Sequence, residues 1–96
     1  MKNGTAYMVA DATNCAYKQS CACSLDELRD VEMIEFVRED LADSIAYCAR
    51  RTGENMDCLL DAVNGAADIP AMFAAIDAAI GARKNYVDTC GLTLTA

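Results

Sequence analysis

The stretch that decides the fold runs from Ser24 to Gly53 and reads SLDELRDVEMIEFVREDLADSIAYCARRTG. It opens with a capping box, in which Ser24 caps the first turn and the Glu27 side chain reaches back to the Ser24 N–H. No glycine or proline interrupts the stretch before Gly53, which is suited to a left-handed C-cap. These features predict one long helix over residues 24–52.

Apolar residues recur along this predicted helix every three or four positions and form one stripe about 80° wide, which we expect to face the core. The stripe consists of Ile34, Val37, Leu41, Ile45 and Cys48. Leu25, Leu28 and Val31 lie outside it. Either the N-terminal segment or a second protomer must cover those three residues, so a homodimer is one open alternative.

Two shorter helices are expected after the long one, over residues 55–64 with Asn55 as N-cap and over residues 68–88 with Asp68 as N-cap. Pro70 falls in the first turn of the second, where its missing N–H is harmless. The loops are short, so neighbouring helices should pack antiparallel.

Residues 1–23 show no helical period and are expected to form an irregular N-terminal arm, with a short strand at Thr5–Val9. Residues 89–96 are expected to form a tail. The 96 residues therefore predict a single all-α domain, a small three-helix antiparallel bundle with one long acidic helix.

Composition excludes several classes of function. The chain has 8 basic and 15 acidic residues, a net charge of −7 and no histidine. Direct nucleic-acid binding is not expected, because it depends on Lys and Arg neutralising phosphates. Without histidine or a nucleophile paired with a base, we expect no enzymatic activity. No stretch has the length of a membrane span or the pattern of a secretory signal, so we expect no membrane contact and a cytoplasmic location.

Most of the net charge lies in residues 26–43, which contain eight acidic and two basic residues. On a helix, Glu32, Glu35, Glu39 and Asp43 fall within about 80° of one another, opposite the apolar stripe. Like charges at this spacing repel by a few tenths of a kcal/mol per pair, so the pattern does not serve the helix itself. A solvated surface and a calcium site are the alternatives, although helical carboxylates lack the loop geometry that calcium sites use.

We therefore interpret this face as a surface for a basic partner. Its candidate residues are carboxylates and one aromatic ring, namely Asp30, Glu32, Glu35, Phe36, Glu39, Asp40 and Asp43. Their role is expected to be electrostatic and largely independent of the fold, so that reversing Glu35 and Glu39 should leave stability nearly unchanged or slightly improved.

In size, acidity and lack of catalytic machinery, the chain is similar in type to phage-encoded inhibitors such as anti-CRISPR and DNA-mimic proteins. The similarity is one of type and is carried by no motif. It implies a small inhibitor that engages a basic, nucleic-acid-handling protein and needs no cofactor.

The alternative function is a cysteine-based metal-binding or redox-active protein. Cys15, Cys21 and Cys23 lie within nine residues and could supply three ligands of a structural zinc site. The Cys-x-Cys spacing differs from the usual Cys-x-x-Cys, and no second pair is present. Six cysteines allow 15 disulfide pairings, and in a cytoplasmic protein we expect reduced thiols.

Replacing Ser24 with alanine should lower the free energy of unfolding by about 0.5–2 kcal/mol, because the first turn loses its N-cap side chain. Urea denaturation measures this change. An unchanged midpoint and slope would mean that the helix begins elsewhere.

Overall fold

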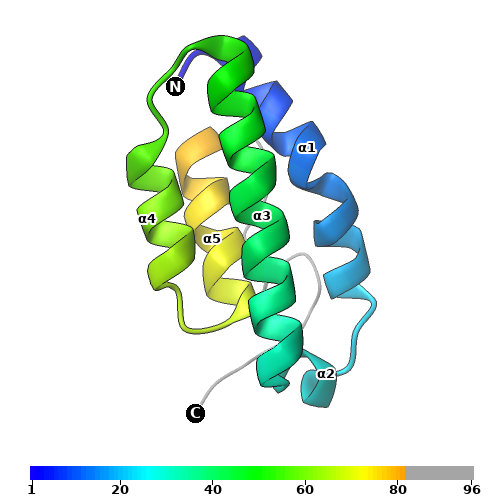
Figure 1. The fold of residues 1–96 in the computed structure, drawn as a ribbon. Coiled ribbons are helices and arrows are strands. Elements are labelled where there is room, and N and C mark those ends of the chain that lie inside the picture. The colour runs from blue at the N-terminus through cyan, green and yellow to red at the C-terminus, as the bar shows by residue number, and fades with distance from the viewer. Residues whose placement is uncertain (82–96) are drawn as a thin grey trace.

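The computed structural model describes residues 1–81, and this part of the chain forms five helices and no strand (Figure 1). In chain order they are α1 (Asn3–Cys21), α2 (Leu25–Arg29), α3 (Val31–Thr52), α4 (Asp57–Gly65) and α5 (Ile69–Ile80). The all-α prediction is confirmed, with five helices in place of the expected three. The part of the predicted last helix after residue 81 and the predicted tail 89–96 lie outside the described residues.

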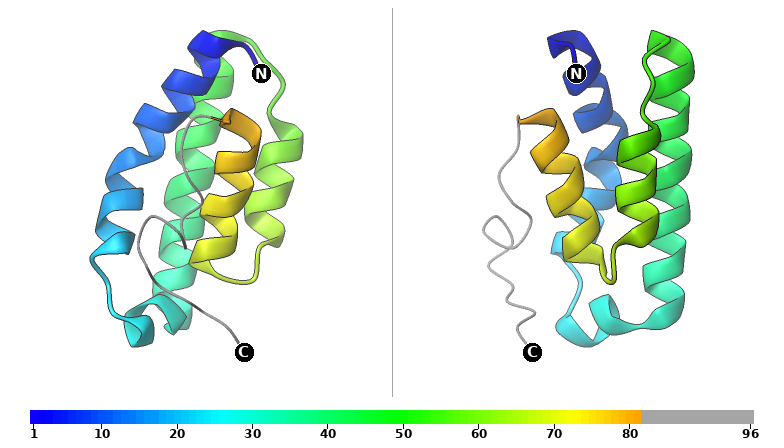
Figure 2. Two further views of the ribbon diagram at one scale, coloured as in Figure 1. Left: turned by 180° about the vertical axis from the view of Figure 1, so that it is seen from behind. Right: turned by 90° about the vertical axis from the view of Figure 1, so that its left-hand side faces the viewer.

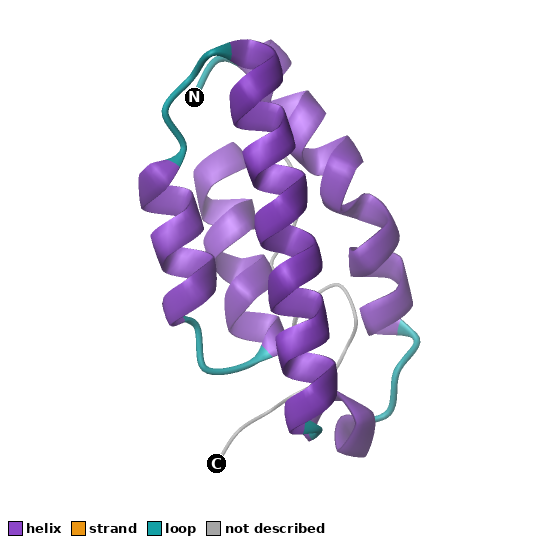
Figure 3. Cartoon of the chain, viewed as in Figure 1, coloured by secondary structure: helices purple, strands orange, loops and turns teal. Residues whose placement is uncertain are grey.

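The central helix is α3, which contacts α1, α2, α4 and α5. It runs along the front of the molecule with α1 on one side and α4 on the other (Figure 1), and from behind α5 is seen between α1 and α4 (Figure 2). Short loops join helices that alternate in direction (Figure 3). The antiparallel packing expected from the loop lengths is confirmed.

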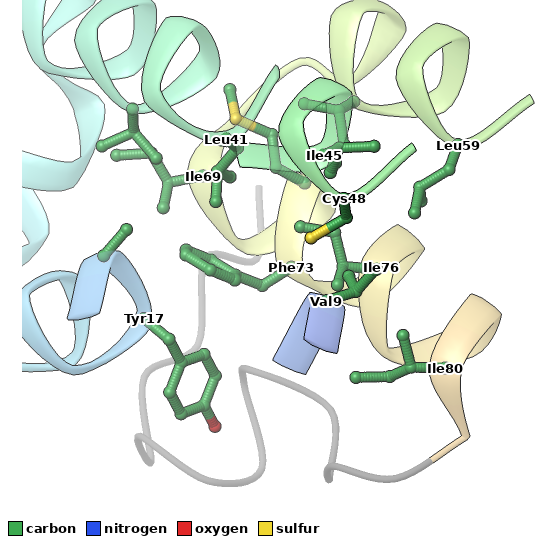
Figure 4. Packing of buried hydrophobic residues seen from close by; sticks show 14 of the residues in the cluster. Val9, Tyr17, Leu41, Ile45, Cys48, Leu59, Ile69, Phe73, Ile76 and Ile80 are labelled. Atoms are coloured by element: carbon green, nitrogen blue, oxygen red, sulfur yellow. The ribbon is translucent and has the colours of Figure 1, made fainter. Parts of the chain in front are cut away.

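The core lies between α1, α3, α4 and α5, and the predicted stripe of α3 points into it (Figure 4). Val37, Leu41, Ile45 and Cys48 are buried, and Ile34 is partly buried at its edge. Phe73 of α5 is fully buried and meets the ring of Tyr17 edge-on, with 5.3 Å between the ring centroids. Such edge-to-face pairs favour one packing arrangement over others.

The prediction of an irregular arm with a strand at its start is wrong, because residues 3–21 form the 19-residue helix α1. Its buried face has the helical period, but much of it consists of small or hydroxyl-bearing residues: Thr5, Ala6, Val9, Thr13, Ala16, Tyr17 and Ser20. Thr13 can be buried because its hydroxyl donates to the Val9 carbonyl at 2.7 Å. No side chain caps the first turn, so the sequence carries no start signal for this helix.

The single long helix predicted over residues 24–52 is interrupted at Asp30. The capping box at Ser24 is present, but it opens only the five-residue α2. Asp30 has extended backbone, and its carboxylate accepts a hydrogen bond from the Met33 N–H at 3.1 Å, which makes it the N-cap of α3. Aspartate is a preferred N-cap residue. This run therefore contains two N-caps, and each begins a helix of its own.

Leu25, Leu28 and Val31, the three apolar residues outside the stripe, differ in burial around the break at Asp30. Leu28 is fully buried within the single chain, so no second protomer is needed to cover it. Leu25 is 36% exposed and Val31 is 74% exposed.

The two shorter helices differ from the prediction at their ends. Helix α4 starts at Asp57, with Met56 as N-cap, and the Asn55 side chain accepts from the Asp57 N–H at 2.8 Å. Asp68 caps α5 as predicted and accepts from the Ala71 N–H at 2.9 Å. Helix α5 ends at Ile80, because Gly81 takes the left-handed conformation of a C-cap.

Arg38 of α3 joins this helix to the end of α4. Its Nη1 donates to the carbonyls of Val63, Asn64 and Ala66 at 2.8–2.9 Å. The last carbonyls of a helix have no partner within the helix, and a cation there also matches the negative end of the helix dipole. One guanidinium therefore satisfies the C-terminal end of α4 and fixes it against α3.

We predict that Arg38→Met lowers the free energy of unfolding by about 1–3 kcal/mol, the cost of leaving partly buried acceptors without a donor. Arg50→Met is the matched control. Arg50 is exposed on the same helix and forms no ion pair within residues 1–81, so its loss should change stability by less than about 0.5 kcal/mol. Equal urea midpoints for the two variants would contradict this role of Arg38.

Candidate functional site

The seven residues predicted as the partner-binding surface are all exposed. Six of them lie on α3, and Asp30 immediately precedes it. The structure divides them by what their side chains contact. Two take part in the fold, and the others face solvent.

Asp30 and Glu35 are the two with a structural role. Asp30 caps α3. The Glu35 carboxylate receives the Nε–H of Arg38 at 3.0 Å and so orients the guanidinium that holds the end of α4. This contact gives Glu35 a place in the fold that the sequence analysis did not expect, because the sequence alone does not show that the end of α4 lies beside Arg38.

The remaining carboxylates of the predicted surface are Glu32, Glu39, Asp40 and Asp43. Among the hydrogen bonds and ion pairs formed within residues 1–81, none involves these four side chains. Two pairs of them, Glu39–Asp43 and Asp40–Asp43, are four and three residues apart, where like charges repel. This part of α3 is therefore charged at some cost to the helix.

Two aromatic rings accompany these carboxylates. Phe36 is 67% exposed, and Tyr47, which the sequence analysis missed, is 49% exposed. On a helix, residues 36, 40, 43 and 47 share one side, because each is three or four positions from the next. That spacing was the available signal for Tyr47. The run of acidic residues ends at Asp43, so charge alone does not indicate Tyr47.

These residues define what we call the acidic face, a strip on α3 opposite its buried stripe. It consists of Glu32, Phe36, Glu39, Asp40, Asp43 and Tyr47. Helix geometry places all six within an arc of about 100°. With 1.5 Å of rise per residue, the strip is about 22 Å long.

The two ends of the acidic face differ in charge. Beyond Glu32, a hollow of about 350 Å³ is lined by Asp26, Glu27, Asp30 and Met33. Hydrogen bonds from the Ser24 N–H and hydroxyl lower the pKa of Glu27, which favours its charged form at neutral pH. Beyond Tyr47, the exposed Arg50 ends the run of acidic residues. The acidic face is therefore followed by further carboxylates at its N-terminal end and by a cation, Arg50, at its C-terminal end.

The cysteines are not gathered into a metal site in the described part of the chain. Cys21 is disulfide-bonded, so the expectation of reduced thiols is wrong at this position. Cys15 and Cys23 are free thiols. Residues 1–81 contain no group of three side chains placed to hold a metal ion.

A second cavity, of about 730 Å³, lies where residues 1–2 meet α4 and α5. Its lining combines small or apolar side chains, such as Leu59, Ala62 and Ala75, with the polar residues Lys2, Glu54 and Cys58. The Glu54 carboxylate accepts a hydrogen bond from the Lys2 backbone N–H at 3.3 Å, and within residues 1–81 no hydrogen bond joins the Cys58 thiol to either residue.

Within residues 1–81, no helix combines the length and the apolar character needed to cross a membrane. Comparisons with protein-family models, with curated proteins and with solved structures find no match to this chain.

The thiols should differ in reactivity toward iodoacetamide. Cys15 and Cys58 are exposed and should react first, whereas Cys48 is fully buried and should react only after unfolding. Desolvation, and then the charge of Glu27, raise the pKa of Cys23. Because the thiolate is the reactive form, Cys23 should react slowly at neutral pH and faster as the pH rises. Peptide mapping by mass spectrometry measures the order, and early labelling of Cys48 would contradict the packing.

Proposed function

We propose that this protein is a non-enzymatic binding protein whose acidic face docks onto a basic surface of a nucleic-acid-handling protein. The observation that carries the proposal is that one side of α3 combines two exposed aromatic rings with four carboxylates that form no ion pair within residues 1–81. A helix side that only kept the protein in solution would gain from interleaved lysines, and α3 has none there.

The two kinds of side chain have separate effects on binding. The carboxylates attract a basic surface over a distance of about 10 Å at 0.1 M salt and discriminate against acidic ones. The rings supply apolar surface that is removed from water when the partner binds. Aromatic residues are also over-represented among the residues that dominate binding energy. Such a protein inhibits its partner by occupying the surface that would otherwise meet phosphates, in the manner of the phage-encoded anti-CRISPR and DNA-mimic inhibitors to which it is similar in type.

A helix held on both sides makes this surface rigid. The core residues of α3 fix its rotation, and Arg38 fixes its position against α4. The acidic face therefore needs little ordering on binding, which reduces the entropic cost of association. A partner of this kind implies a cytoplasmic site of action.

The test uses Asp40→Lys combined with Asp43→Lys, which avoids Glu35 and its contact with Arg38. The fold should tolerate the change, because it places a lysine four residues after Glu39, the favourable orientation for an ion pair on a helix. Binding to a partner captured from a bacterial extract by the wild-type protein should weaken by a few kcal/mol through lost attraction and new repulsion.

Asp11→Lys combined with Asp61→Lys is the matched control, since it changes the net charge equally but lies on exposed positions of α1 and α4. The control should bind as the wild type does. Calorimetric titration at two salt concentrations should also show wild-type affinity falling as salt rises. Equal loss of binding in both variants, or affinity independent of salt, would leave the acidic face as ordinary solvated surface.

A further inference from the structure

The disulfide bond of Cys21 needs a second cysteine, and the other thiols of the chain identify it. Cys21 is the last residue of α1 and is disulfide-bonded. The chain has six cysteines, of which four are free thiols, namely Cys15, Cys23, Cys48 and Cys58. The sixth is Cys90, which lies outside the described residues. Within this chain, Cys90 is therefore the one cysteine left to pair with Cys21.

The distance from the end of α5 back to Cys21 is within reach of the intervening chain. Helices α1 and α5 pack against each other and run in opposite directions, so α1 ends near the start of α5 (Figure 2). Helix α5 has 12 residues and is about 18 Å long. The nine residues 82–90 span roughly 30 Å when extended. This reach covers the length of α5 and also the separation of about 8–10 Å between two packed helices.

We propose that Cys21 and Cys90 form a redox-sensitive disulfide that fastens the C-terminal segment of the chain to the end of α1. The bond opens in a reducing cytoplasm and persists in an oxidising compartment. This proposal is independent of the proposed function, because neither cysteine belongs to the acidic face.

The bond stabilises the helix that has the weakest local signals. No side chain caps the first turn of α1. Much of its buried face consists of small or hydroxyl-bearing residues, which bury less apolar area than Leu or Ile. The bond closes residues 21–90 into one covalent loop that contains α2–α5 and holds the last residue of α1. A loop of this length removes much conformational entropy from the unfolded chain.

A dithiol opens the bond by two exchange steps. Cys21 is only partly buried, so a small reductant can reach its sulfur. One thiolate of the dithiol attacks the bond, forms a mixed disulfide and releases one cysteine. The second thiol then attacks the mixed disulfide and releases the other cysteine. The dithiol is oxidised to a disulfide, and its two electrons and two protons leave Cys21 and Cys90 as thiols.

The neighbouring Cys23 does not compete for the bond at neutral pH. Its thiol donates a hydrogen bond to the Gln19 carbonyl at 3.3 Å. Desolvation, and then the charge of Glu27, raise the pKa of Cys23, so little of it is the thiolate that attacks disulfides. The pairing of Cys21 with Cys90 is therefore kept although a free thiol lies two residues away.

Peptide mapping of the unreduced wild-type protein tests the pairing. Free thiols are blocked with N-ethylmaleimide in urea at slightly acidic pH before digestion. Trypsin leaves Cys21 and Cys23 together in residues 19–29, and Cys90 in residues 85–96. The two peptides should be found joined, with one maleimide on Cys23. A maleimide on Cys90, or a bond from Cys90 to another cysteine, would overturn the proposal.

Thermal unfolding with and without dithiothreitol tests the effect of the bond. Reduction should lower the wild-type Tm by about 10 °C or more, because the unfolded chain regains conformational entropy. Cys21→Ser and Cys90→Ser should each show the lowered Tm, and dithiothreitol should lower it no further. Cys15→Ser is the matched control, since Cys15 is an exposed free thiol on the same helix. It should keep both the wild-type Tm and the response to dithiothreitol.

Reduced wild-type protein also shows whether the bond is redox-sensitive in a reversible way. After dithiothreitol is removed, glutathione disulfide should restore both the joined peptides and the original Tm. A wild-type Tm that is the same with and without dithiothreitol, or that does not return on oxidation, would overturn the proposal. The mapping and the reduction both use the wild-type chain, so they decide the matter even if a serine variant fails to fold.

Discussion

The guanidinium of Arg38 fixes the end of α4 against α3, the helix that carries the acidic face. It closes the C-terminal end of α4 through three carbonyls and is itself oriented by Glu35. Both residues lie on α3 between its buried stripe and its exposed side. Helix α3 therefore has a different role on each of three sides. One side packs in the core, one holds α4 through Arg38, and one carries the acidic face.

This division explains why the acidic block cannot be treated as uniform. Asp30 and Glu35 are acidic residues whose side chains make structural contacts, one at a helix start and one beside a cation. The carboxylates of the acidic face make no such contact within residues 1–81, and neighbours among them repel. Since no hydrogen bond or ion pair within residues 1–81 uses these four carboxylates, we propose recognition of a partner as their role.

The sequence was informative wherever a strong local signal matched the final packing. The capping box at Ser24, the Asp68 cap and the apolar stripe of α3 are all present in the structure. Helix α1 was missed because hydroxyl-bearing residues such as Thr13 take core positions that usually hold apolar residues. The break at Asp30 was missed because the run contains two N-caps and both are used, Ser24 for α2 and Asp30 for α3. The role of Glu35 depends on α4, which is distant in sequence.

Carboxyl footprinting on the complex tests the central claim most directly. Side-chain carboxylates are coupled to glycine ethyl ester before and after partner binding, and the labelled sites are read by mass spectrometry. If the acidic face meets the partner, its four carboxylates should lose reactivity in the complex, while Asp57 and Asp61 of α4 should keep theirs. Protection of the α4 carboxylates, with those of α3 still fully labelled, would contradict it.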